Sequence, residues 1–153
     1  MSEATDQIKC VLLAINEDSI LLPNTALAEI IPIRNMINVA NKPNWMLGYL
    51  DWRGQPVPLV SFEAIGGVRM PSLASGNVKA AVVYSIRSGS KFPFISFLVQ
   101  GEPKVLSLHA TDVIASKEPV EHPAIDQKVM VKEDMASIID LEKLGQVIES
   151  VLT

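Results

Sequence analysis

Cysteine is almost absent from this 153-residue sequence. The sequence also lacks long apolar runs, basic stripes and the motifs of common enzymes, each of which would indicate a class of protein. The single cysteine, Cys10, excludes an intramolecular disulfide and is typical of a reducing compartment. No run approaches the ~20 apolar residues needed to span a bilayer, and the polar, acidic start at residues 1–6 does not resemble a secretory signal. We therefore expect a cytoplasmic protein with no direct membrane insertion.

Basic residues are too scattered to form a nucleic-acid-binding surface. The net charge is −4, and no stripe of Lys and Arg is interleaved with aromatic residues. Because phosphate neutralisation supplies most non-specific affinity for nucleic acids, we expect no nucleic-acid partner. Aromatic residues make up only 5% of the chain and hydrophobic residues 48%, so aliphatic side chains must fill most of a globular core.

The motifs of common enzymes are missing too. The sequence has no phosphate-binding Gly-x-x-x-x-Gly-Lys-Ser/Thr loop, no Gly-x-Gly-x-x-Gly and no Gly-x-Ser-x-Gly elbow. His109 and His122 have no partner at ligand spacing, so we expect no metal site. Cys10 lies in an apolar run, which favours a buried, inert thiol over a nucleophile. We expect neither an enzyme nor a bound cofactor.

Short apolar runs rich in strand formers alternate with turn residues along most of the chain. Residues 8–15 and 20–22 predict a hairpin, and residues 46–60 predict two strands around a turn at residues 53–55. Pro56 and Pro58 cannot donate ladder hydrogen bonds, so they indicate a sheet edge or a barrel rim. Further strands are predicted at residues 78–86, 92–100, 104–108, 127–131 and 136–141.

Helical signals are confined to two short segments. Asn24 or Thr25 could cap a short helix near residues 25–31 that Pro32 ends, and residues 140–152 carry apolar side chains at helical spacing. Roughly seven to ten short strands with so little helix indicate an all-β fold built of barrels. The Gly- and Ser-rich residues 66–77 predict a mobile loop between two halves, and residues 1–7 predict a flexible tail.

One turn combines residue types that are common in binding hot spots. Arg53 is flanked by Trp52 and Tyr49, and hot spots are enriched in Trp, Tyr and Arg. Asp51 lies two residues from Arg53 on the same strand face and could pair with it, while Glu29 lies in an otherwise apolar segment. The simpler interpretation of these charged residues is surface ion pairing worth under about 1 kcal/mol. The more specific interpretation is that they form a binding epitope.

Residues 46–60 resemble the central signature of CheW domains. The residues at its expected positions are Gly48, Arg53, Gly54 and Pro58. Residues 27–30 resemble the family's Val-x-Glu-Ile segment, residues 98–101 its Val-Asp-Gly segment, and residues 138–144 its closing Ile-Leu-Asp-x-x-x-Leu. The resemblance therefore covers nearly the whole chain.

This resemblance implies one CheW-like domain, residues 8–152, made of two five-stranded SH3-like β-barrels packed on a shared core. It also implies a non-enzymatic adaptor that couples a methyl-accepting chemoreceptor to the regulatory domain of a CheA-type histidine kinase, recruited from the cytoplasm to membrane receptor arrays. In the family the glutamate and arginine of these motifs lie near the contact surface. By that match and by adjacency, the expected partner-binding residues are Glu29, Asp51, Trp52, Arg53 and Gly54.

Three positions depart from the family pattern. Asp51 replaces the usual asparagine, Ser61 replaces the aspartate that ends the strand, and Gln100 replaces the aspartate before Gly101. These departures suggest a divergent adaptor, from a chemosensory system that controls type IV pili and twitching motility rather than flagella. Two other classes remain open: a small hydrolase that uses Cys10 or dispersed carboxylates, and a sensor that binds a small ligand between the lobes.

Overall fold

Strands dominate the computed structural model of the chain, which describes residues 7–15, 18–68, 77–85 and 91–152. In these residues, eleven strands belong to one hydrogen-bonded sheet. The tail predicted at residues 1–7, except Gln7, and most of the loop predicted at 66–77 lie outside the described residues. The prediction of an all-β fold with a C-terminal helix is confirmed.

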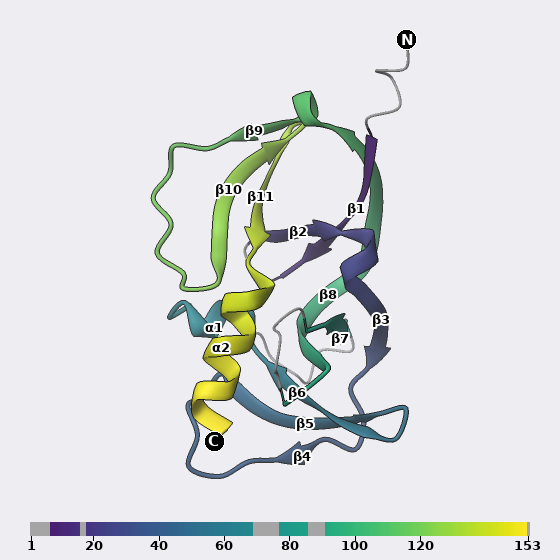
Figure 1. Ribbon diagram of the computed structural model, residues 1–153, viewed down its shortest axis with the longest axis vertical. Coiled ribbons are helices and arrows are strands. Elements are labelled where there is room, and N and C mark those ends of the chain that lie inside the picture. Colours follow the sequence, from purple (N-terminus) through teal and green to yellow (C-terminus); the bar gives the residue numbers. More distant parts are fainter. Residues whose placement is uncertain (1–6, 16–17, 69–76, 86–90, 153) are drawn as a thin grey trace.

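The strands fall into two groups along the long axis of the molecule (Figure 1). The upper barrel contains β1 (Gln7–Ala14), β2 (Ser19–Pro23), β9 (Val113–Ala115), β10 (Ile125–Val131) and β11 (Asp134–Ile139). The lower barrel contains β3 (Leu27–Pro32), β4 (Ile37–Asn38), β5 (Met46–Trp52), β6 (Gln55–Val60) and β7 (Val78–Tyr84). The long strand β8 (Phe94–His109) belongs to both barrels, because it pairs with β6 and β7 at its start and with β1 further on.

Strand β8 shows how one chain segment joins the two barrels. The sequence predicts two strands broken at residues 101–103, but β8 continues through this break. Opposite it on β1, Leu12 pairs with Lys104 and Ala14 with Gln100, so the extra residues of β8 form a bulge. A bulge bends a strand and increases its twist, which lets β8 leave one barrel and enter the other.

A buried cluster between the barrels forms the shared core that the resemblance implies. It includes Leu13 and Ile20 of the upper barrel, Phe97 of β8 and Phe62 of the short helix α1 (Phe62–Ile65). Helix α2 (Leu141–Leu152) covers the cluster with the apolar side chains Leu141, Leu144 and Ile148. Separate buried clusters fill the interior of each barrel.

The prediction of a helix near residues 25–31 is wrong. Residues Asn24–Ala26 form one turn of 3-10 helix with no side-chain cap, and strand β3 begins directly after it. Strand β3 pairs along its length with β7. The segment is too short to be a stable isolated helix, and the β-branched Ile30 and Ile31 favour a strand once a partner strand is available.

The lower barrel has a seam between β3 and the β5–β6 hairpin. In the described residues β3 pairs with β7, whereas β5 pairs with β4 and β6, so no backbone ladder crosses the seam. Among the residues that the structure describes, β6 pairs with β8 only at Leu59 and Val60, which leaves Pro56 and Pro58 where the strand has one ladder neighbour. The edge position predicted for the two prolines is confirmed.

We expect Gly48→Ala to destabilise the fold by at least about 2 kcal/mol. A Cβ at this position would overlap the backbone carbonyl oxygen of Ile37, and Gly48 also has a φ of +153°. Chemical denaturation measures the loss, and hydrogen exchange at Ile37 and Asn38 should show that β4 detaches. Gly67→Ala is the matched control, because Gly67 also has positive φ but no atom within 4 Å of its Cβ position. Equal losses in the two variants would contradict the role of the close approach.

Candidate docking surface

The β5–β6 hairpin turns on Arg53 and Gly54, within the turn predicted at residues 53–55, whereas Gln55 already begins β6. Trp52 pairs with Gln55, and the two residues between them have positive φ values, 51° for Arg53 and 81° for Gly54. Positive φ at both central positions is the type I′ geometry that matches the twist of the two strands. The turn exposes Gly54 and leaves the Arg53 side chain 69% exposed.

Trp52 lies beneath this turn and not on the surface. It is 6% exposed and packs with Val57 and Val82 inside the lower barrel. Its ring meets the Phe94 ring edge-on, with 4.6 Å between the two ring centroids. Trp52, one of the expected partner-binding residues, is therefore buried and offers no exposed surface beside Arg53. Successive strand residues point to opposite faces, so Trp52 points inward where Asp51 points outward.

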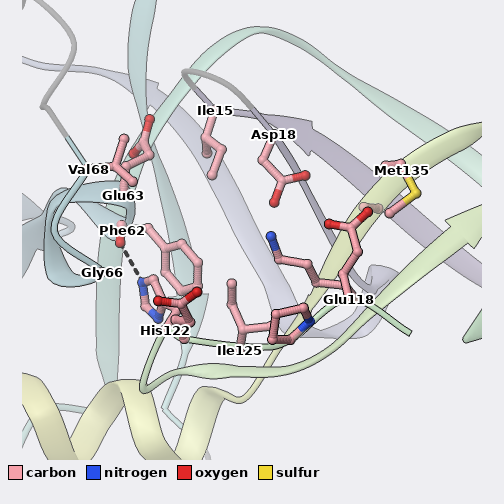
Figure 2. Close-up of a pocket in the computed structure, with 14 residues that line it drawn as sticks. Ile15, Asp18, Phe62, Glu63, Gly66, Val68, Glu118, His122, Ile125 and Met135 are labelled. Atoms are coloured by element: carbon pink, nitrogen blue, oxygen red, sulfur yellow. Dashed lines mark hydrogen bonds between the residues drawn. The ribbon is translucent and has the colours of Figure 1, made fainter. Parts of the chain in front are cut away.

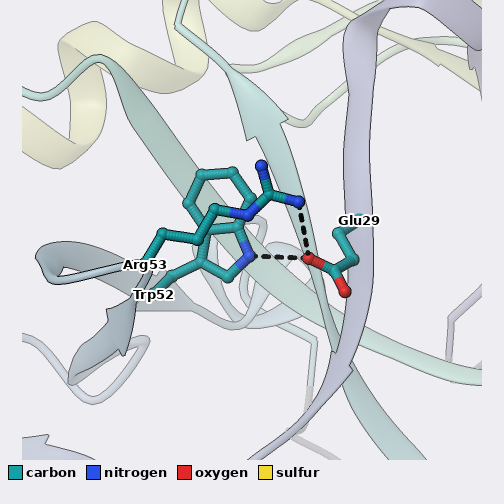
Figure 3. Close-up of polar contacts among 3 residues, drawn as sticks. All are labelled: Glu29, Trp52 and Arg53. Carbon is teal, nitrogen blue, oxygen red and sulfur yellow. Dashed lines mark hydrogen bonds and ion pairs between the residues drawn. The ribbon is translucent and has the colours of Figure 1, made fainter.

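Glu29 connects Trp52 and Arg53 across the seam of the lower barrel (Figure 3). The indole Nε1–H of Trp52 donates a hydrogen bond to Glu29 Oε1 at 2.9 Å, and Arg53 Nη2 lies 3.5 Å from the same oxygen. Arg53 Cζ also lies 4.6 Å from the centroid of the Trp52 ring. Within the described residues Arg53 thus pairs with Glu29 and not with Asp51, which contradicts the pairing suggested by the sequence. We call Glu29, Trp52 and Arg53 the docking corner.

The docking corner fixes the direction of an exposed cation at little cost in stability. The Arg53–Glu29 pair is largely exposed, and such pairs contribute at most about 1 kcal/mol. The buried indole holds Glu29 by a hydrogen bond and Arg53 by its ring face, so the conformational freedom of the Arg53 side chain is already restricted. Asp51 is exposed on the adjacent strand position but makes no part of this arrangement.

Two aromatic residues that the sequence did not single out support the corner. Phe94 of β8 packs on Trp52, and Tyr84 of β7 packs on Phe94 with 5.2 Å between ring centroids. They lie more than thirty residues from Trp52 along the chain, so no local pattern connects them to it. The one sequence feature that points to Tyr84 is the period-2 alternation of β7, which places Tyr84 on the same strand face as Val82.

A separate cavity of about 490 Å³ lies between α1 and the β10–β11 hairpin (Figure 2). Its apolar lining includes Ile15, Phe62 and Ile125, and carboxylates from Asp18 and Glu118 also reach it. In the part of the chain that the structure describes, no three His, Cys, Asp or Glu side chains are grouped to hold a metal ion. The volume is in the range of small-molecule sites.

His122 closes one side of the cavity as a neutral imidazole. Its Nδ1 accepts a hydrogen bond from the Ala124 N–H at 2.9 Å, so its proton is on Nε2, which donates to the Phe62 carbonyl at 2.6 Å. The imidazole ring is stacked on the Phe62 ring with 4.1 Å between centroids. Burial lowers the pKa of His122; the Phe62 carbonyl opposes that shift and the charge of Lys128 adds to it.

We expect the free energy of unfolding to fall in acid because of His122. Since its pKa is lower in the folded chain, the unfolded chain takes up a proton first as the pH drops below about 6.5, the ordinary histidine value. Above about pH 7.5 both states are neutral and this contribution vanishes. Denaturation of wild type and His122→Asn between pH 5 and 8 measures the effect. Plotted against pH, the free energies of unfolding of wild type and His122→Asn should converge toward low pH. His109→Asn should keep the pH dependence of wild type. Parallel curves for wild type and His122→Asn would contradict a lowered pKa of His122 in the folded chain.

Cys10 is buried in β1, as expected from its apolar run. It packs with Leu12, Leu21 and Leu108 inside the upper barrel, and this burial raises the pKa of its thiol. A thiol with a raised pKa is a poor nucleophile at neutral pH. The geometry gives no support to a hydrolase that uses Cys10.

Comparisons with known proteins identify relatives of the chain. The family model described as CheW-like domain matches residues 9–149. The crystal structure of the scaffolding protein TtCheW from Thermoanaerobacter tengcongensis is similar, with a TM-score of 0.73, 14% sequence identity, and coverage of 88% of this chain and 90% of that chain. No curated protein matches the sequence significantly. Among the described residues, no helix has the length and apolar character needed to cross a membrane.

Proposed function

The chain belongs to the CheW-like domain family, and on this premise we propose that it is a non-enzymatic adaptor in chemosensory signalling. In this proposal it couples a methyl-accepting chemoreceptor to a CheA-type histidine kinase, in the cytoplasm at membrane receptor arrays. The docking corner contacts the regulatory domain of the kinase, and a different surface contacts the receptor tip. The fold shared with a scaffolding protein supports an adaptor role.

One observation carries the proposal: the arginine of the family signature is exposed and held in place. Arg53 is 69% exposed at the tip of a tight turn, and Trp52 and Glu29 fix its direction from below. An arginine positioned in this way suits bidentate recognition of a carboxylate. Gly54 contributes by allowing the turn, and Asp51 lies exposed beside it.

An adaptor of this kind needs no reacting group. If the docked kinase has a different affinity for the adaptor in its active and inactive arrangements, docking shifts the population between them. Single contacts of modest strength suffice, because repeated contacts in an array raise the effective concentration.

One departure from the family pattern, Ser61, leaves the local structure intact. Ser61 replaces an aspartate, yet its hydroxyl oxygen accepts a hydrogen bond from the Ala64 N–H at 3.3 Å and caps α1. Serine and aspartate are about equally good at this position. We propose that the departures from the family pattern reflect a chemosensory system that controls type IV pili.

Binding measurements with the purified partners test the proposed function. Wild-type protein should bind the kinase regulatory domain and the receptor's cytoplasmic hairpin separately, and should change kinase autophosphorylation when all three are mixed. Absence of binding to both partners would overturn the proposal.

The cavity beside His122 favours one alternative, a sensor that binds a small ligand. A ligand that binds the folded state stabilises it by mass action. Thermal-shift screening should show no stabilisation by metabolites if the adaptor proposal is right, whereas a saturable shift that is lost when the cavity is filled from its exposed rim by Val68→Trp would support the sensor.

A further inference from the structure

Tyr84 lies at the end of the lower barrel where the docking corner is found. On β7 the residues Ala80 and Val82 point into the barrel, and Val82 packs with Trp52. Tyr84 follows the same alternation as the last residue of β7, but it is 45% exposed. Among the described residues it is the one aromatic side chain with such exposure.

An unbroken series of contacts connects Tyr84 to Arg53. The Tyr84 ring lies 5.2 Å from Phe94, the Phe94 ring lies 4.6 Å from Trp52, and Arg53 Cζ lies 4.6 Å from the Trp52 ring, all measured to ring centroids. Phe94 is the cross-strand partner of Tyr84, so backbone pairing fixes the first of these contacts. The same aromatic cluster therefore holds both exposed side chains.

We propose that Tyr84 is a second contact residue of the docking corner, which extends from Arg53 across the barrel end to Tyr84. Tyrosine supplies a large contact area at low cost in conformational entropy, and hot spots combine Tyr and Arg in this way. Within the described part of the chain the Tyr84 hydroxyl has no hydrogen-bond partner. This proposal requires that the kinase regulatory domain has an apolar patch that contacts the Tyr84 ring, next to an oxygen acceptor for Arg53. This inference rests on the proposed function.

Photo-crosslinking tests the contact without removing the ring. Replacement of Tyr84 by benzoylphenylalanine should give a cross-link to the kinase regulatory domain on irradiation. The same replacement at Tyr49, the other tyrosine of the chain, should give none, because Tyr49 packs on Phe92 and lies on the opposite face of its strand from Trp52. In parallel, Tyr84→Ala should weaken binding about tenfold or more.

The outcomes separate this inference from the proposed function. A cross-link at position 84 together with weaker binding by Tyr84→Ala supports it. Wild-type binding that is lost in Arg53→Glu, with no cross-link at position 84, would leave the adaptor function standing and overturn the role of Tyr84. If wild-type protein binds neither partner, both proposals fail.

Discussion

Charge reversal by Arg53→Glu should weaken binding to the kinase regulatory domain by roughly 30-fold or more while the protein stays folded. The variant removes the exposed cation and places a second carboxylate beside Glu29. Because the native ion pair is largely exposed, the free energy of unfolding should change by about 1 kcal/mol or less. Calorimetric titration measures the affinity, and urea denaturation measures the stability.

Lys132→Glu is the matched control for this variant. Lys132 is also an exposed cation with positive φ, 58°, in a hairpin turn, but this turn joins β10 and β11 of the upper barrel. The same charge reversal there should leave the affinity for the kinase domain within about twofold. Equal losses of affinity in the two variants would indicate a general effect of net charge and would contradict the docking corner.

Trp52→Ala should lower the free energy of unfolding by about 3–5 kcal/mol, the usual cost of truncating a buried tryptophan. Trp52 is 6% exposed and packs with Val57, Val82 and Phe94, so its truncation to alanine leaves a cavity among them. The milder Trp52→Phe keeps most of the ring and removes the Nε1–H that bonds Glu29. We expect it to stay folded but to bind the kinase domain more weakly, because Glu29 and Arg53 lose their common support.

The other tryptophan of the chain provides the control for Trp52→Phe. Trp45 is half-buried and packs against the shared core, whereas Trp52 belongs to a different buried cluster. Trp45→Phe should show a similar or smaller loss of stability and unchanged affinity. If Trp52→Phe binds as tightly as wild type, the indole hydrogen bond to Glu29 does not position the surface.

Much of the fold could be predicted from the sequence because the turn residues are explicit. The hairpin at Arg53-Gly54 and the edge position of Pro56 follow from local backbone preferences. The helix prediction at residues 25–31 is wrong because the Pro and Asn residues there suit a helix start, whereas pairing with β7 makes the segment a strand. The strand break predicted at residues 101–103 is wrong for a similar reason: β8 stays paired with β1 by forming a bulge.

The candidate site was only partly visible in the sequence. Arg53 and Glu29 were found through the family signature, and they do meet in the structure. Trp52 enters the expected partner-binding set only by its adjacency to Arg53, although alternation along a strand sends adjacent side chains to opposite faces. Tyr84 and Phe94 were missed because their relation to Trp52 arises from pairing between strands that are distant in sequence.

Chemical-shift mapping with the kinase regulatory domain tests most directly whether the docking corner is a contact surface. On addition of the unlabelled domain to isotope-labelled protein, the amide signals of Glu29 and of Asp51 through Gln55 should shift or broaden first. Perturbations confined to β9, β10 and β11, with Arg53 and its neighbours unchanged at saturation, would contradict the account.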